Sequence, residues 1–162
     1  MKLETLVEHM IKESGGTYDA VTFSEGTDKR IKKFVDDHHI PNPLSPKKYH
    51  CTVIYSKKYL PTFKAMGKIE PHWIGTPTKL DIFKTAEGSN CLVLRFDCKD
   101  VVDRHHFVMK KYGATYDHPV FKNHITLSYD IGDDFDIKPL QSFVKNIGPI
   151  EIIEEYSEGL DE

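Results

Sequence analysis

The chain of 162 residues carries a formal net charge of −3, with 39% hydrophobic and 29% charged residues, as is ordinary for a soluble globular protein. This length suffices for one domain, or for two small lobes that share a core, and the acidic balance argues against a long nucleic acid as ligand. No apolar run is long enough to span a membrane, the N-terminus lacks a secretory signal, and three cysteines without metal spacing fit reduced thiols in a cytosolic protein.

Apolar periodicity and chain breakers predict the elements of the first half. A helix over residues 3–11 is followed by a strand over 18–23 and by a second helix that should begin near residue 26. Three prolines make residues 40–48 a rigid loop that leads into the next strand. Residues 57–76 contain two prolines and two glycines, so they are expected to be irregular, and long irregular segments are often lids.

The second half should contain two strands joined by a turn, then a helix, a strand, a short helix and a last strand. Mixed elements without regular β-α-β alternation predict an α+β fold with antiparallel sheets. A helix that leads to a histidine-containing strand occurs once in each half, which suggests two related lobes. The expected ranges, in order, are 78–85, 91–97, 100–112, 123–130, 138–146 and 150–156.

A repeated motif is the strongest signal: His-x-Thr-aliphatic-x-Tyr occurs at residues 50–55 and again at 124–129. The counts of these residue types predict only about 0.03 copies by chance. Because side chains alternate along a strand, each motif should place its His, its Thr and its fifth residue, Ile54 or Ser128, on one face. The motif tyrosines then fall on the opposite, apolar row and are expected to pack.

Two histidines on facing strands can divide acid–base work, because one neutral imidazole accepts a proton while a charged one donates a proton. Each threonine hydroxyl can donate to a phosphate oxygen whose charge grows in the transition state. Two His and two Thr lack the carboxylate or thiolate ligands of a stable metal site, so no metal or other cofactor is expected. Residues 47–68 carry six lysines and no acid, which fits either a small anionic ligand or a solvated loop.

The two motifs, 74 residues apart, resemble those of the two-histidine (2H) phosphoesterase superfamily, a bilobal α+β fold with one motif per lobe facing a central groove. Five stretches extend this resemblance to the anti-CBASS phosphodiesterases of T4-like phages, namely residues 13–18, 41–43, 50–52, 57–61 and 123–130. The resemblance covers most of the chain, which is expected to form a single bilobal domain over residues 1–162.

The resemblance implies metal-independent hydrolysis of 3′–5′ phosphodiester bonds in cyclic di- and trinucleotides such as 3′,3′-cyclic GMP-AMP. This reaction would block CBASS anti-phage immunity in the cytoplasm of an infected bacterium, with no obligate protein partner. Two alternatives stay open: another 2H enzyme that acts on 2′,3′-cyclic or 2′–5′ RNA linkages, and a sponge that binds cyclic nucleotides without cutting them.

Matching by position, the resemblance assigns His50, Thr52, His124 and Thr126 as the catalytic set. It also implies three kinds of substrate contact: a tyrosine near the reacting phosphate, an aromatic stacked on a base, and a glutamate near the C-terminus. The residues predicted for these contacts are Tyr18, Trp73 with Phe83 as its competitor, and Glu155, which alternation places on the face opposite Ile150 and Ile152.

Overall fold

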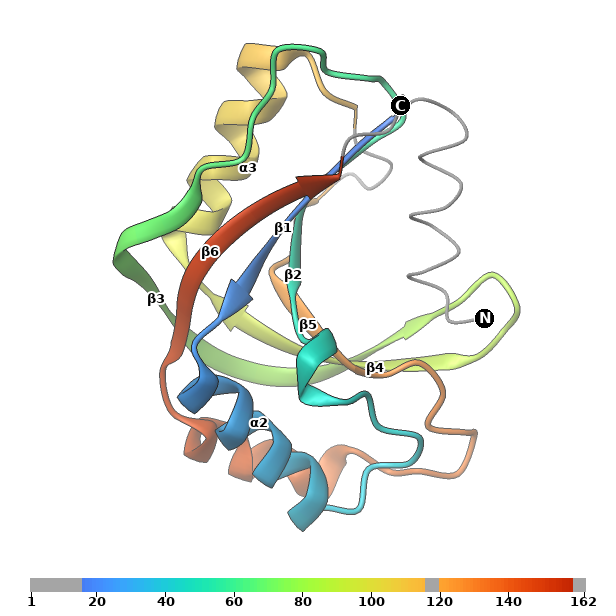
Figure 1. Cartoon of the computed structure of the whole chain (residues 1–162). Coiled ribbons are helices and arrows are strands. Elements are labelled where there is room, and N and C mark those ends of the chain that lie inside the picture. Colours follow the sequence, from blue (N-terminus) through green and yellow to red (C-terminus); the bar gives the residue numbers. More distant parts are fainter. Residues whose placement is uncertain (1–15, 116–119, 159–162) are drawn as a thin grey trace.

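The computed structural model describes residues 16–115 and 120–158. Six strands form one sheet in the order β2-β1-β6-β3-β4-β5, and neighbouring strands are antiparallel (Figure 1). This is the α+β fold with antiparallel pairing that the sequence predicts, whereas the helix expected over residues 3–11 lies outside the described residues. The strands are β1 (Thr17–Phe23), β2 (Cys51–Ser56), β3 (Gly67–Lys84), β4 (Asn90–Asp97), β5 (His124–Ser128) and β6 (Ile150–Glu158).

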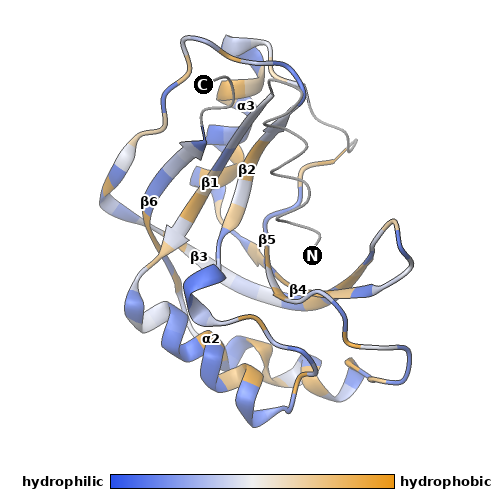
Figure 2. Cartoon of the chain, turned by 45° about the vertical axis from the view of Figure 1, so that its right-hand side comes forward, coloured by the Kyte–Doolittle hydropathy of each residue, from blue (hydrophilic) through white to orange (hydrophobic). Residues whose placement is uncertain are grey.

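The helical elements lie at the two ends of the sheet, with α3 at one end and α2 and η2 at the other (Figure 1). Ser24 caps α2, since its Oγ accepts a hydrogen bond from the Thr27 N–H at 3.2 Å. Gly113 ends α3 with a φ of 67°, as the sequence predicts. Hydrophilic residues dominate the surface helix α2, and the two central strands, β6 and β3, mix hydrophilic with hydrophobic residues (Figure 2). The helical elements are α2 (Glu25–Asp37), the 3₁₀ turn η1 (Pro46–Lys48), α3 (Lys99–Tyr112) and the 3₁₀ helix η2 (Lys138–Ile147).

Strand β3 joins the two halves of the sheet, because its first part pairs with β6 and its second part pairs with β4. The prediction of an irregular segment over residues 57–76 is therefore wrong from Gly67 onward. Pro71 lies where the register with β6 shifts, so the strand is already irregular at this residue. Gly75 lies so close to Phe96 that a Cβ would come within 2.8 Å of the ring. Pro71 and Gly75 therefore lie inside a strand and do not end it. Pro71 coincides with the irregular pairing, and Gly75 allows close packing on Phe96.

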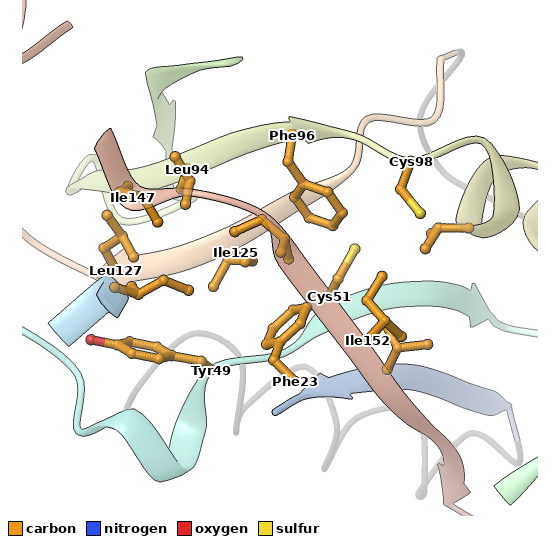
Figure 3. Packing of buried hydrophobic residues seen from close by; sticks show 14 of the residues in the cluster. Phe23, Tyr49, Cys51, Leu94, Phe96, Cys98, Ile125, Leu127, Ile147 and Ile152 are labelled. Carbon is orange, nitrogen blue, oxygen red and sulfur yellow. The ribbon is translucent and has the colours of Figure 1, made fainter. Parts of the chain in front are cut away.

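The main core fills the space between the two halves (Figure 3). Phe23 of β1 and Phe96 of β4 meet edge to face with their ring centroids 6.4 Å apart. Beside them, Cys51 of β2 and Ile125 of β5 enter the same core, and the two edge strands contact each other. The sheet therefore curls until its first and last strands meet. This closure brings the two sequence motifs side by side.

Both motif strands lose their alternation at the same point. Opposite β1 the paired residue changes from Ile54 to Thr52, and opposite β4 it changes from Ser128 to Thr126, so the aliphatic residue after each motif threonine is skipped. Such a β-bulge turns Ile54 and Ser128 away from the histidines, and both are fully buried, which corrects the prediction from alternation. The first bulge also brings Tyr55 to the face of Thr52, not to the predicted apolar row.

Within the described parts of the chain, no helix has the length and apolar content needed to cross a membrane. The three cysteines are free and buried, as expected for reduced thiols. Burial raises the pKa of Cys51 to about 12, and its side chain enters the core on the side away from the motif histidines. A thiol in this state is a packing residue and not a nucleophile.

Candidate active site

The face of the sheet that carries His50, Thr52, His124 and Thr126 is called the histidine face below. His50 directly precedes β2 and His124 begins β5, so each imidazole projects from the start of an edge strand. The four side chains are half-buried, while the residues between them enter the core. The structure therefore places the predicted catalytic set on two strands that contact each other.

The two imidazoles are held by the same backbone interaction. Nδ1 of His50 lies 2.8 Å from the carbonyl oxygen of Lys48, and Nδ1 of His124 lies 2.9 Å from that of Lys122. A carbonyl oxygen only accepts hydrogen bonds, so each Nδ1 carries the hydrogen and donates. In the neutral imidazole, Nε2 then carries the basic lone pair, so it is the atom that accepts a proton and, in the charged ring, donates one. Two equivalent proton-transfer groups result.

Tyr18 supports the first motif. It is buried, its hydroxyl lies 3.1 Å from Oγ1 of Thr52, and its ring meets the edge of the His50 ring at a centroid distance of 6.3 Å. The structure thus brings Tyr18 together with both residues predicted to be catalytic in that motif. Its burial and its hydrogen bond indicate that it orients the Thr52 hydroxyl.

The two candidate aromatic residues lie on opposite sides of the sheet. The ring of Phe83 contacts the ring of His124, with centroids 5.0 Å apart. Trp73 instead pairs with Ile152 and packs against the main core, so the structure does not bring it to the histidines. Phe83 is the aromatic that the fold places beside the second motif.

Glu155 lies on the opposite face of the sheet from the histidines. A bulge in β6 changes the residue paired with β1 from Ile152 to Glu154, so Glu155 shares the core side with Ile152, contrary to the predicted alternation. Its carboxylate is fully buried, accepts two hydrogen bonds of 2.9 Å from Arg104 and accepts one of 2.7 Å from the N–H of Met66. These contacts give Glu155 a structural role.

A second buried carboxyl lies beside this ion pair. Burial, together with the neighbouring Glu155 carboxylate, raises the pKa of Asp19 to about 10, so Asp19 is protonated at neutral pH. One negative charge then faces the single guanidinium of Arg104. The site is a neutralised structural cluster and not part of the histidine face.

The acidic residue that sequence reasoning missed is Glu158. It pairs directly opposite Tyr18 across β1 and β6, and residues directly opposite in an antiparallel pair share a face, so Glu158 lies on the histidine face. Tyr156 lies on the same face, with its ring 6.4 Å from that of Tyr18. The β1–β6 register is needed to see this placement. Alternation counted from Ile152 would put Glu158 on the core side, but the bulge between Ile152 and Glu154 reverses the faces.

His105 of α3 is buried and binds the backbone of the first motif strand, β2. Its Nδ1 donates to the carbonyl of Val53 at 2.7 Å, its ring stacks on Phe121 at 3.9 Å, and burial lowers its pKa. It therefore braces the residue that follows Thr52. Among the described residues, no three His, Cys, Asp or Glu side chains converge in the way that a metal site requires.

The fold matches solved structures over most of their length. E. coli LigT aligns in its apo form with a TM-score of 0.57 and in its phosphate complex with a TM-score of 0.55, each at 16% identity and covering 87% of this chain and 84% of that chain. The fold is thus that of the two-histidine phosphoesterases.

Sequence comparison gives the particular family. The model of the family described as anti-CBASS protein Acb1 matches residues 15–162. Anti-CBASS protein Acb1 of Enterobacteria phage T4 is 34% identical over 148 residues, covering 91% of this chain and 90% of that protein. The protein of the same name from Vibrio phage KVP40 is 31% identical over 149 residues, covering 92% and 90%. The chain belongs to the anti-CBASS protein Acb1 family.

Proposed function

We propose that the protein is a metal-independent phosphodiesterase that cleaves 3′–5′ bonds in cyclic di- and trinucleotides and so blocks CBASS immunity. The observation that carries this proposal is the pair of imidazoles on contacting strands, each with Nδ1 bound to a backbone carbonyl. In this tautomer the basic nitrogen of each ring is Nε2, and cleavage by an internal nucleophile requires two such proton-transfer atoms. The proposed mechanism uses no cofactor.

In the proposed reaction, the ribose 2′-hydroxyl attacks its neighbouring phosphorus and the bond from phosphorus to the 5′-oxygen breaks. One motif histidine takes the proton from the 2′-hydroxyl, and the other gives a proton to the departing 5′-oxygen. Thr52 and Thr126 donate hydrogen bonds to the non-bridging oxygens, where negative charge grows. The product is a 2′,3′-cyclic phosphate, or the 3′-phosphate to which water opens it.

Two residues on the histidine face are proposed to bind the nucleoside parts. Phe83 provides a ring on which a base can stack beside His124, and this stacking is worth about 1–3 kcal/mol. Glu158, opposite Tyr18, provides a carboxylate that can accept hydrogen bonds from base N–H groups. Trp73 and Glu155 are left out of this assignment because they lie on the core side.

The relatives support the biological setting. Their shared name is anti-CBASS protein, and those from phages T4 and KVP40 match this chain over about nine-tenths of both lengths. We place the activity in the cytoplasm of an infected bacterium, where the cyclic nucleotide signal is made. The sponge is the weaker alternative, since sequestration needs no pair of proton-transfer groups.

Single histidine variants test the assignment. His50→Ala and His124→Ala should each reduce turnover of 3′,3′-cyclic GMP-AMP by at least about a hundredfold, because each removes one proton-transfer step. Binding, measured by calorimetry, should persist in both variants. His106→Ala, at an exposed position of α3, is the matched control and should keep full activity. Full activity in His124→Ala would refute the mechanism.

A further inference from the structure

The sequence repeat extends two residues further upstream than the histidines. Lys48-x-His50 and Lys122-x-His124 carry a lysine at the same position, and the carbonyl of each lysine holds the following imidazole. The backbone carbonyls of the two lysines thus help to orient the motif histidines. The side chain of Lys122 reaches toward Phe83, with its Nζ 5.9 Å from the centroid of the Phe83 ring. That ring in turn contacts His124.

Strand register adds a second cation on the same side. Arg95 pairs directly opposite His124 across β4 and β5, so both side chains are on the histidine face. Lys79 pairs opposite Arg95 on the next strand, which gives a row of three basic side chains across β3, β4 and β5. Asp81 accepts a hydrogen bond of 3.2 Å from Nη1 of Arg95. This bond fixes the guanidinium, which has further N–H donors for a ligand.

The histidine face differs at the corresponding place in the other half. There the β1–β6 register puts Tyr156 and Glu158 opposite Ala20 and Tyr18. The side next to His124 therefore carries more basic than acidic side chains, although Asp81 is paired with Arg95 there, and the side next to Tyr18 carries the carboxylate of Glu158. A phosphate of the ligand other than the one between the histidines would then bind toward β4 and β5.

We propose that Lys122 and Arg95 form an anion subsite that binds a second, uncleaved phosphodiester of the substrate. This inference rests on the proposed function and adds to it a reason for preferring cyclic oligonucleotides. The scissile phosphate lies between the histidines and threonines, and a cyclic dinucleotide presents its other phosphate across the ring. A substrate with only one phosphodiester cannot fill both places.

The test compares two substrates that have the same 3′–5′ bond. One is 3′,3′-cyclic GMP-AMP, with two phosphates, and the other is a linear dinucleoside monophosphate, with one. In Lys122→Gln, the ratio of their KM values should shift about three- to tenfold against the cyclic substrate, while kcat on each changes less than twofold. Arg95→Lys keeps the positive charge but loses the planar set of guanidinium N–H donors, and it should shift the KM ratio in the same direction.

The control is Lys84→Gln on the same hairpin, one residue after Phe83 and so on the opposite face of β3. It should leave the KM ratio unchanged.

A linear trinucleoside diphosphate, which has two phosphates but no ring, is the third substrate. If Lys122→Gln raises its KM as it raises that of the cyclic substrate, the subsite binds any second phosphate. If its KM does not change, the subsite requires the cyclic form. An equal rise in KM for the one- and two-phosphate substrates in Lys122→Gln would overturn the subsite. Failure of the unaltered protein to cleave either would instead overturn the proposed function.

Discussion

The motif histidines owe their orientation to backbone carbonyls two residues earlier, and Thr52 owes its orientation to Tyr18. The hydroxyl of Tyr18 lies 3.1 Å from Oγ1 of Thr52, inside a buried cluster with Ala20. The two halves of the site are alike in the way that their imidazoles are held.

Removing that hydroxyl should slow the chemical step. Tyr18→Phe keeps the ring in the buried cluster but loses the hydrogen bond to Thr52, worth about 1 kcal/mol, so kcat should fall roughly fivefold while KM changes little. Steady-state kinetics on a cyclic dinucleotide measures this. In a Thr52→Val background, Tyr18→Phe should have almost no further effect on kcat, since the two residues act through one bond. Additive losses would contradict this positioning role.

At the scale of elements, the bulges decide which residues face the substrate. Alternation correctly places His50, Thr52, His124 and Thr126 together, because the bulge in each motif follows the threonine. Alternation fails beyond that point. In β6 the same effect turns Glu155 to the core, where it binds Arg104.

The buried carboxyl of Asp19 should make the stability of the β1–β6 layer depend on pH. Its pKa is raised to about 10 in the folded chain from an ordinary value of 3.8, so the folded state holds a proton that the unfolded state releases. The free energy of unfolding should therefore fall as pH rises between these values. The pKa of Asp28, raised by burial to about 7, contributes to the same decline at lower pH.

The window from pH 7 to 9 shows the contribution of Asp19 best, because Asp28 titrates below it and the buried thiol of Cys51, whose pKa is raised from 9.0, contributes above it. In Asp19→Asn, urea unfolding across this window should show a flatter decline of stability with pH than in the unaltered protein. Glu87→Gln, in the exposed turn between β3 and β4, is the control and should keep the original slope. An unchanged slope in Asp19→Asn would show that Asp19 does not carry the proton.

Strand β3 couples the two halves, and Gly75 is where its backbone passes closest to β4. A Cβ at this position would lie 2.8 Å from Phe96 and 3.1 Å from the carbonyl oxygen of Asp97. Gly75→Ala should therefore lower the free energy of unfolding by about 1–3 kcal/mol, measured by chemical denaturation. Gly26→Ala in α2, where a Cβ would meet nothing within 4 Å, should instead stabilise the protein by about 0.5–1 kcal/mol. Equal effects would contradict the crowding at Gly75.

At the scale of the whole molecule, the sequence predicts the α+β class, most element boundaries and the two motifs. Local sequence patterns are enough for these predictions, because the type and the ends of a helix or strand depend mainly on residues close together in the sequence. The closure of β2 against β5 could be inferred only from the family resemblance, since no local pattern records which edge strands meet. For the same reason local patterns do not place Phe83, Glu158 and Arg95 on the histidine face, since their places depend on register across strands.

In the proposed mechanism, two histidines cleave a cyclic nucleotide through its own 2′-hydroxyl, without a metal. The most direct measurement is incubation of the purified protein with 3′,3′-cyclic GMP-AMP in excess EDTA, with chromatographic identification of the product ends. We expect linear products that end in a 2′,3′-cyclic phosphate or a 3′-phosphate, and none from the His50→Ala/His124→Ala double variant. Intact ligand, or products that end in a 5′-phosphate, would contradict it.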